Sequence, residues 1–238
     1  MILLTHGDRE YLRETGETLE TDLGVLDIPT ETTPGDVLST HLGEEFRVRS
    51  LRGPDLFNHF ERTGAPMLPR DIGLVIGEAG ISRDDRVLDA GTGTGVLASY
   101  MGLVGADVLT YERNPEFAAV ARNNIELAGV NERVEVRTGD LTEEIEERSK
   151  FDVLTLDTED APELVARADE LLVPGGFLAV YSPFVEATRE VCEVARESLS
   201  DVRAVETIQR ELDVDMRGTR PSTGPVGHSG YLVFGRNQ

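Results

Sequence analysis

Three glycines at alternate positions, Gly91, Gly93 and Gly95, lie in the segment VLDAGTGTGVL, residues 87–97. The apolar run before them has the pattern of a buried strand, and the run after them, VLASYMGLVG, has the pattern of a helix. A glycine turn between a strand and the next helix is where open α/β sheets bind ligands, because the missing side chains let a ligand approach the backbone. The segment therefore predicts a ligand-binding α/β sheet.

Strand-like and helix-like patterns alternate from Arg86 onward, which is typical of a doubly wound sheet. The helix after Arg113 is well marked, with Asn114 as N-cap, Pro115 in the first turn and Gly129 just past the end. Strands are expected over 86–91, 108–113, 134–140, 151–157 and 176–183, and helices over 96–105, 114–129, 161–172 and 186–199. Two consecutive strand-like runs near the C-terminus, 202–216 and 228–236, predict an antiparallel hairpin that closes the sheet.

The first part of the chain has a different pattern. Residues 1–52 contain short β-like runs, such as the one in which Phe46 and Val48 alternate with arginines, and predict a small β domain. Residues 53–238 then form one large domain, which begins with helices over 54–62 and 69–80.

Composition limits the class of protein. A chain of 238 residues with 39% hydrophobic content suits one sizeable core with a small addition. The chain has no apolar stretch long enough for a membrane span and no basic flank of a signal peptide, so we expect a cytoplasmic protein without a membrane partner.

The single cysteine, Cys192, excludes an internal disulfide and a thiolate zinc cluster, and we expect it to pack in a helix. His6, His41 and His59 lack metal-ligand spacing, so no metal is expected.

The formal net charge of −22 opposes a nucleic-acid partner, because Lys and Arg supply most non-specific affinity for phosphates. The acidic residues are spread along every segment, however, and Lys150 is the only lysine among 23 basic residues. Such a surface fits a protein adapted to molar salt, in which charge is screened within about 3 Å. We therefore hypothesise a halophilic protein.

The spacing of the turn separates two ligand classes. A dinucleotide-binding loop would read G-x-G-x-x-G, but Val96 stands where its third glycine is expected, so NAD is the second choice. Glu112 ends the second strand about twenty residues after Gly91, where an acidic side chain accepts hydrogen bonds from ribose hydroxyls. Asp140 ends the third strand. These carboxylates suit an adenosine ligand without a pyrophosphate.

This combination resembles the class I S-adenosylmethionine-dependent methyltransferases, and the resemblance implies S-adenosylmethionine as cofactor. The residues that it implies for cofactor binding are Gly91, Thr92, Gly93, Thr94, Gly95, Leu97, Glu112, Arg113, Asp140, Leu141 and Asp157.

Three further segments narrow the resemblance. FERTGAPMLPRDIGLVI, LLVPGGFLAVYSP and RPSTGPVGHSGYLVFGR look like the archaeal and bacterial tRNA (adenine-N1)-methyltransferase family, and the similarity covers essentially the whole chain. What this implies is a homotetramer that methylates adenine in the T-loop of tRNA, at position 58 with position 57 as a second candidate. The implied partner is therefore tRNA.

The chemistry of adenine N1 methylation calls for a carboxylate near the target base, and Asp157 is the candidate. N1 of neutral adenine already carries a lone pair, so methylation needs an acceptor for the exocyclic amine as positive charge develops, rather than a strong base. Asp157 ends the fourth strand and matches the family's catalytic aspartate. The family usually continues with a loop that bears Pro and Trp, whereas Thr158–Pro162 follow here and the chain has no tryptophan.

Adenine must leave its stack to be methylated, so a pocket for the extracted base is expected. Tyr181 matches an aromatic residue beside the family's substrate pocket. Met67 and Leu68 are further candidates for this pocket, although core packing explains them equally well, and Leu68 stands where many relatives carry tyrosine. Arg220 and His228 match the family's tail motif, and they either contact RNA or hold the hairpin turn.

Three alternatives differ in chemistry. A cytosine-C5 methyltransferase needs a cysteine that attacks the ring, and Cys192 is misplaced on its helix. A small-molecule methyltransferase of the same fold fits the acidic surface. A non-catalytic tRNA-binding partner subunit would be favoured by an eroded glycine turn, but the turn, Glu112, Asp140 and Asp157 are all present.

Overall fold

The computed structural model describes residues 1–144 and 150–238, and these residues form two compact units, 1–60 and 61–238. Sequence analysis places the boundary between residues 52 and 53. In the structure, helix α1 (Gly53–His59) belongs to the first unit instead of opening the second.

The first unit is built from short antiparallel strands. Its four-stranded sheet has the order β2-β1-β6-β5, and a separate hairpin pairs β3 with β4. The strands are β1 (Ile2–His6), β2 (Arg9–Arg13), β3 (Thr18–Thr21), β4 (Gly24–Asp27), β5 (Val37–Ser39) and β6 (Glu45–Arg49). Phe46 and Val48 point into the core while the arginines between them stay exposed, which confirms the alternation and the small β domain.

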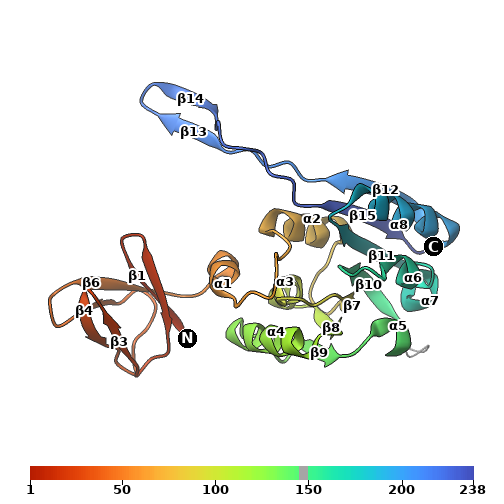
Figure 1. Cartoon of the computed structure of the whole chain (residues 1–238). Coiled ribbons are helices and arrows are strands. Elements are labelled where there is room, and N and C mark those ends of the chain that lie inside the picture. Colours follow the sequence, from red (N-terminus) through yellow and green to blue (C-terminus); the bar gives the residue numbers. More distant parts are fainter. Residues whose placement is uncertain (145–149) are drawn as a thin grey trace. The chain divides into compact units, whose positions relative to one another are not determined.

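The second unit contains a seven-stranded sheet of order β12-β15-β11-β10-β7-β8-β9 (Figure 1). Five strands are parallel: β7 (Arg86–Ala90), β8 (Asp107–Glu112), β9 (Val134–Thr138), β10 (Phe151–Leu156) and β11 (Leu172–Ser182). Two are antiparallel to their neighbours: β12 (Ser200–Glu206) and β15 (Tyr231–Arg236). The doubly wound sheet predicted from the alternating patterns is therefore confirmed.

Helices cover both faces of this sheet (Figure 1). One face holds α2 (Pro69–Ala79), α3 (Val96–Val104) and α4 (Pro115–Leu127), and the other holds α5 (Leu141–Glu144), α6 (Ala161–Val165), α7 (Ala168–Leu171) and α8 (Val185–Ser198). Helix α4 begins as expected, because the Asn114 side chain accepts a hydrogen bond from the Glu116 N–H at 2.9 Å. Cys192 is buried in α8, as predicted. Within the described ranges, no helix has the length and apolar character needed to cross a membrane.

The structure differs from the sequence prediction in the region before β11. The single helix expected over 161–172 is divided into α6 and α7, and β11 begins at Leu172 rather than at residue 176. Leu172 is buried and pairs with Phe151, so the chain leaves the helix here to join the sheet. The register then shifts before Val153 pairs with Phe177, and Gly175 has a φ of +84° in the added segment.

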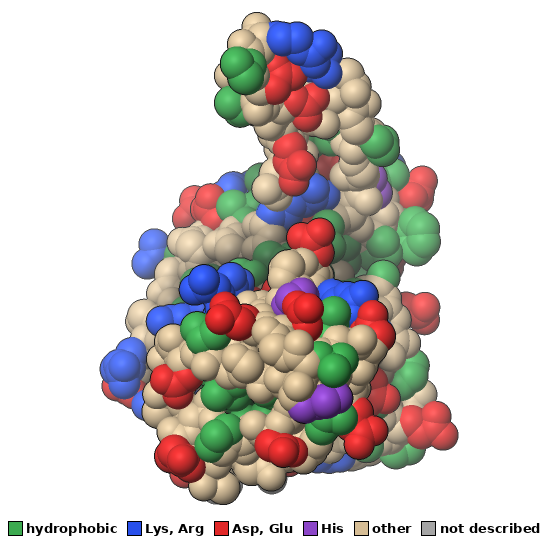
Figure 2. Space-filling view, turned by 90° about the vertical axis from the view of Figure 1, so that its left-hand side faces the viewer, with side chains coloured by type: hydrophobic (Ala, Val, Ile, Leu, Met, Phe, Trp, Pro, Cys, Tyr) green, Lys and Arg blue, Asp and Glu red, His purple; other side chains and the backbone are tan. Residues whose placement is uncertain are grey.

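The predicted C-terminal hairpin is present, since β12 pairs with β15 antiparallel and closes the sheet. The connection between them is longer than a turn, because β13 (Leu212–Asp215) and β14 (Gly218–Pro221) form a second hairpin that extends away from the sheet (Figure 1). At the top of Figure 2, the tip of this hairpin carries basic, acidic and hydrophobic side chains together. The strand expected over 202–216 is therefore interrupted at 207–211.

The strand order places a ligand crevice in one position. The chain runs from β7 outward to β8 and β9, and then returns to β10 on the other side of β7. Helices that follow β7 and β10 therefore lie on opposite faces, which opens a crevice at the carboxyl ends of these two strands. Gly91 and Asp157 are the residues that directly follow them.

Candidate active site

The three glycines of the turn serve different purposes. A Cβ atom on Gly91 would lie 2.0 Å from the Asp157 carbonyl oxygen, and one on Gly95 would lie 3.3 Å from Ala121 of α4. A Cβ on Gly93 would lie 3.9 Å from its nearest neighbours, the Gly91 carbonyl oxygen and the Thr63 hydroxyl. Gly91 and Gly95 thus allow close packing within the protein, whereas Gly93 faces open space that a ligand can fill.

Two cavities adjoin this turn. Cavity A, of about 380 Å³, lies between the ends of β8, β9 and β10, and cavity B, of about 190 Å³, lies between the turn and residues 63–67. Both are lined by Gly91, Gly93, Phe117 and Asp157. Predicted site residues in cavity A are Glu112, Arg113, Asp140 and Leu141, and those in cavity B are Thr92, Thr94, Leu97 and Met67. The structure thus brings all the predicted cofactor residues except Gly95 to one place.

Glu112 fixes the shape of the turn. Its carboxylate accepts a hydrogen bond from the Gly93 N–H at 2.9 Å and another from the Asn114 N–H at 3.0 Å. A carboxylate offers about four acceptor positions, so two remain for hydroxyl groups of a ligand in cavity A. The same side chain can therefore shape the turn and bind a ligand.

Asp140 and Arg113 lie at the opening of cavity A. Asp140 accepts hydrogen bonds from the Thr142 hydroxyl at 2.7 Å and the Thr142 N–H at 2.9 Å, which keep its pKa below the usual value. Arg113 Nη1 lies 2.7 Å from Asp160 Oδ2 and 3.6 Å from Asp140 Oδ2. The guanidinium therefore links the loops that follow β9 and β10.

Asp157 lies where the two cavities meet. Its backbone N–H donates to the Ala90 carbonyl oxygen at 2.8 Å, which holds the loop after β10 against the glycine turn. Burial raises the pKa of its carboxyl to about 7, and the negative charges of Asp89 and Glu112 act in the same direction. The carboxyl therefore changes protonation state near neutral pH.

Sequence analysis named Met67 but missed Thr63 in the segment that walls cavity B. Thr63 contacts Thr94 of the turn through their hydroxyls at 3.2 Å, and the buried Asn124 side chain donates to the carbonyls of Glu61 and Thr94. It also missed Phe117, which lines both cavities from α4. The apolar pattern of the helix gives no sign that this ring faces a cavity.

The predicted substrate residues occupy several positions. Met67 is buried and lines cavity B, whereas Leu68 precedes α2 and lines none of the cavities described. The Tyr181 hydroxyl donates to the Ser229 carbonyl at 2.5 Å. Burial raises the pKa of Tyr181 to about 12, and the Asp157 charge contributes, so the ring lies within electrostatic reach of Asp157.

The two tail residues already have partners within the chain. The ring nitrogens of His228 lie 2.7 Å from Glu206 and 3.2 Å from the Pro183 carbonyl, and the carboxylate raises the pKa of the imidazole. Arg220 Nε lies 3.5 Å from Asp213, its cross-strand partner on the β13–β14 hairpin. These contacts favour the interpretation in which both residues hold the tail.

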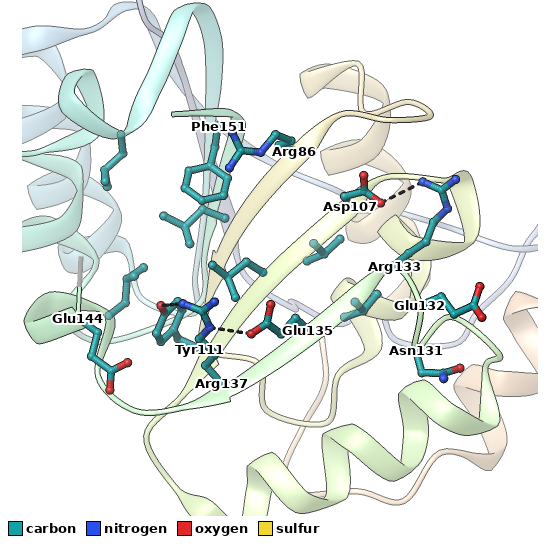
Figure 3. Close-up of a pocket in the computed structure, with 16 residues that line it drawn as sticks. Arg86, Asp107, Tyr111, Asn131, Glu132, Arg133, Glu135, Arg137, Glu144 and Phe151 are labelled. Atoms are coloured by element: carbon teal, nitrogen blue, oxygen red, sulfur yellow. Dashed lines mark hydrogen bonds and ion pairs between the residues drawn. The ribbon is translucent and has the colours of Figure 1, made fainter. Parts of the chain in front are cut away.

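A third cavity, larger than cavities A and B, lies elsewhere. Cavity C, of about 710 Å³, is on the face of the sheet over β7, β8 and β9 (Figure 3). Two of its arginines are paired within the cavity, Arg137 with Glu135 at 2.8 Å and Arg133 with Asp107 at 3.0 Å. It lacks the glycine turn and the strand-end carboxylates, so we place the active site at cavities A and B. Among residues 1–144 and 150–238, no cluster of His, Cys, Asp and Glu could hold a metal ion.

Comparisons with known proteins point to the methyltransferases. Residues 81–214 match the model of a methyltransferase domain family. The chain is 32% identical to a tRNA (adenine(57)-N(1)/adenine(58)-N(1))-methyltransferase of Methanocaldococcus jannaschii, over 97% of this chain and 92% of the relative. It is 30% identical to a tRNA (adenine(58)-N(1))-methyltransferase of Thermus thermophilus, over 85% of this chain and 81% of the relative. The solved structure of an S-adenosylmethionine-dependent O-methyltransferase from Thermotoga maritima resembles this chain with a TM-score of 0.84 and 26% sequence identity. The match covers 99% of this chain and 92% of that protein.

The open space at Gly93 predicts a specific loss of binding. Gly93→Ala places a methyl group in that space, and we expect affinity for S-adenosylhomocysteine, measured by calorimetry, to fall at least about tenfold. Gly129→Ala is the matched control, because Gly129 also has a positive φ and open surroundings but lines none of these cavities. Equal affinity in the Gly93 variant and the control would contradict the assignment.

Proposed function

Because this chain belongs to the tRNA (adenine-N1)-methyltransferase family, we propose that it transfers a methyl group from S-adenosylmethionine to N1 of adenine in the T-loop of tRNA. The relatives act at adenine 58 or at adenines 57 and 58, and we assign the same positions here. The observation that carries the proposal is the position of Asp157 at the junction of two cavities, directly against the glycine turn. We place this reaction in the cytoplasm, with tRNA as the partner.

The residues present fit S-adenosylmethionine. Gly93 leaves open the space that a Cβ would occupy, which suits a ligand that passes close to the backbone. We assign Glu112 to the ribose hydroxyls and Asp140 to the adenine amine of the cofactor. When bound, the cofactor supplies an activated methyl group on a positively charged sulfur.

Asp157 then acts on the target base. Its ionised carboxylate accepts a hydrogen bond from the exocyclic amine of adenine and so orients N1. As the base becomes a cation, this hydrogen bond strengthens, and the carboxylate stabilises the transition state more than the ground state. No proton needs to leave N1, because its lone pair is already free.

Nucleoside mass spectrometry tests the activity. Unmodified tRNA incubated with the protein and S-adenosylmethionine is expected to yield 1-methyladenosine. A transcript in which adenines 57 and 58 are both replaced is expected to yield none. Methylation of another base, or of a small molecule alone, would contradict the proposal.

A second candidate is a methyltransferase of smaller substrates. The likeness to the Thermotoga maritima O-methyltransferase and the net charge of −22 favour it. The 97% coverage of this chain by the Methanocaldococcus jannaschii relative favours tRNA. A non-catalytic subunit is disfavoured, because the turn and Asp157 form an intact site.

Asp157→Asn tests the catalytic role. Loss of the negative charge is worth about 3 kcal/mol in the transition state, so we expect a rate about a hundredfold lower in single-turnover methylation at saturating tRNA. Because the carboxylate is the active form and its pKa is raised to about 7, the wild-type rate should rise with pH through this region, and the variant should lose that rise.

The control is Glu163→Gln, which removes an exposed carboxylate from α6, just beyond the same loop. It should keep both the rate and the pH profile. An Asp157→Asn rate within a few fold of wild type would move the catalytic role to another group.

We also propose a homo-oligomer, a tetramer by family resemblance, that is adapted to high salt. The described hairpin region exposes large apolar side chains that suit burial against another subunit, namely Ile208, Leu212, Val214 and Met216. The acidic residues spread along the chain support the salt adaptation, since their repulsion is screened only at high ionic strength.

Light scattering and circular dichroism test both points. In molar KCl, we expect a mass that is a multiple of the 26.1 kDa chain, and in dilute buffer a loss of folded structure. Val214→Arg should lower the mass in molar KCl, whereas Leu103→Arg, at an exposed position of α3, should not. A monomer in molar KCl would contradict the oligomer, and equal stability in both buffers would contradict the salt adaptation.

A further inference from the structure

A buried carboxylate lies behind the site and is not used in the mechanism above. Asp89, on β7, is only 2% exposed. Its Oδ1 accepts from the Thr155 hydroxyl of β10 at 2.5 Å, and its Oδ2 accepts from the Thr110 hydroxyl of β8 at 2.5 Å. Both threonines stand directly opposite Asp89 in the registers of the sheet.

The hydroxyl contacts extend to the cofactor turn. The hydroxyls of Thr92 and Thr110 lie 2.5 Å apart. Because the hydrogen of Thr110 is donated to Asp89, Thr92 must donate to Thr110. Thr92 lies in the glycine turn and lines cavity B, so the carboxylate of Asp89 is connected to the cofactor site through two hydroxyls.

We propose that Asp89 is a positioning residue for methyl transfer, which holds the glycine turn through Thr110 and Thr92 and places a fixed negative charge behind Asp157. This inference rests on the proposed function. Asp89 touches none of the cavities, so it acts through other residues.

An acidic side chain at position 89 supports a role for its negative charge. A buried carboxylate without a cation carries a large desolvation penalty, and an asparagine of the same shape would avoid most of it. The partners here are hydroxyls, which can donate to a carboxylate but can equally pair with an amide. A purely structural role therefore does not require an acidic residue at this position.

The charge has a defined effect on Asp157. Burial raises the pKa of Asp89 to about 6, and the hydrogen bonds from the two threonine hydroxyls act in the opposite direction by favouring the carboxylate. The charge of Asp89 in turn raises the pKa of Asp157. This negative charge then makes the Asp157 carboxylate a more basic acceptor for the adenine amine. The stronger acceptor gives more stabilisation as the base becomes a cation.

Charged and titratable side chains on the neighbouring elements also act near Asp157. Glu112 of β8 acts with Asp89, Tyr181 of β11 senses the charge of Asp157, and Asp71 and Arg70 of α2 act on Tyr181. The remaining charged residues of cavity A are Arg113, Asp140, Glu159 and Asp160. Arg113 is already paired with Asp160, so it does not cancel the effect of Asp89.

Asp89→Asn tests the inference with two readouts. We expect the pKa of Asp157 to fall by about one unit. Infrared difference spectroscopy measures this titration without substrate, and the Asp157 band is identified by its absence in Asp157→Asn. The rise of the single-turnover rate should move to lower pH by the same amount, with a lower plateau.

A second variant keeps both carboxyls. Thr155→Val removes one donor from Asp89, which raises the pKa of Asp89 and leaves it neutral near pH 7, so the pKa of Asp157 should again fall. Thr155→Ser keeps the donor and should restore the wild-type value. These two variants at Thr155 test the shift in the pKa of Asp157 even if Asp89→Asn does not fold.

The matched control is Asp71→Asn. Asp71 is also a buried carboxyl, 1% exposed, which accepts from a hydroxyl, that of Ser229 at 2.8 Å. Its replacement should leave the Asp157 band in place. An unchanged band in Asp89→Asn and Thr155→Val, or an equal shift in Asp71→Asn, would overturn the inference. Failure of the proposed function is distinguishable, because tRNA would then stay unmethylated while the infrared titration still reports on Asp89.

Discussion

The close contact between the glycine turn and the loop after β10 is the constraint on which the site depends. A Cβ on Gly91 would lie 2.0 Å from the Asp157 carbonyl oxygen, and the Asp157 N–H donates to Ala90 at 2.8 Å. Only glycine allows these two strand ends to meet so closely. Their contact brings the Asp157 side chain beside the open space at Gly93, where a cofactor and a target base can be held together.

Much of the fold and site could be predicted because the signals are local. The glycine turn, the alternating patterns, and the strand ends at Glu112, Asp140 and Asp157 are each visible within a few residues, and parallel strands bring their ends to one edge. The hydroxyl pair around Asp89 was missed because Thr155 lies 66 residues away, and single threonines in apolar strands show no periodic signal. The division of the helix over 161–172 also depends on a distant contact, that of Leu172 with Phe151.

Negative charge at the site is consistent with the proposed chemistry. The methyl donor is a cation, and the positive charge passes to adenine as the methyl group moves, so carboxylates near the reacting atoms favour both the bound donor and the methylated base. Asp157 is the carboxylate at the junction of the cavities, and its pKa is raised by burial first and then by the charges of Asp89 and Glu112. Because the net charge of the chain is −22, we expect it to recognise RNA through shape and base contacts more than through phosphates.

We assign the active site to the strand-end cavities A and B rather than to the larger cavity C on the sheet face. A crystal structure of the protein with S-adenosylhomocysteine distinguishes the two positions. We expect electron density for the nucleoside in cavity A, with the ribose at Glu112 and the sulfur directed toward Asp157. Density for the ligand in cavity C, between Arg137 and Arg86, with cavities A and B empty, would contradict it.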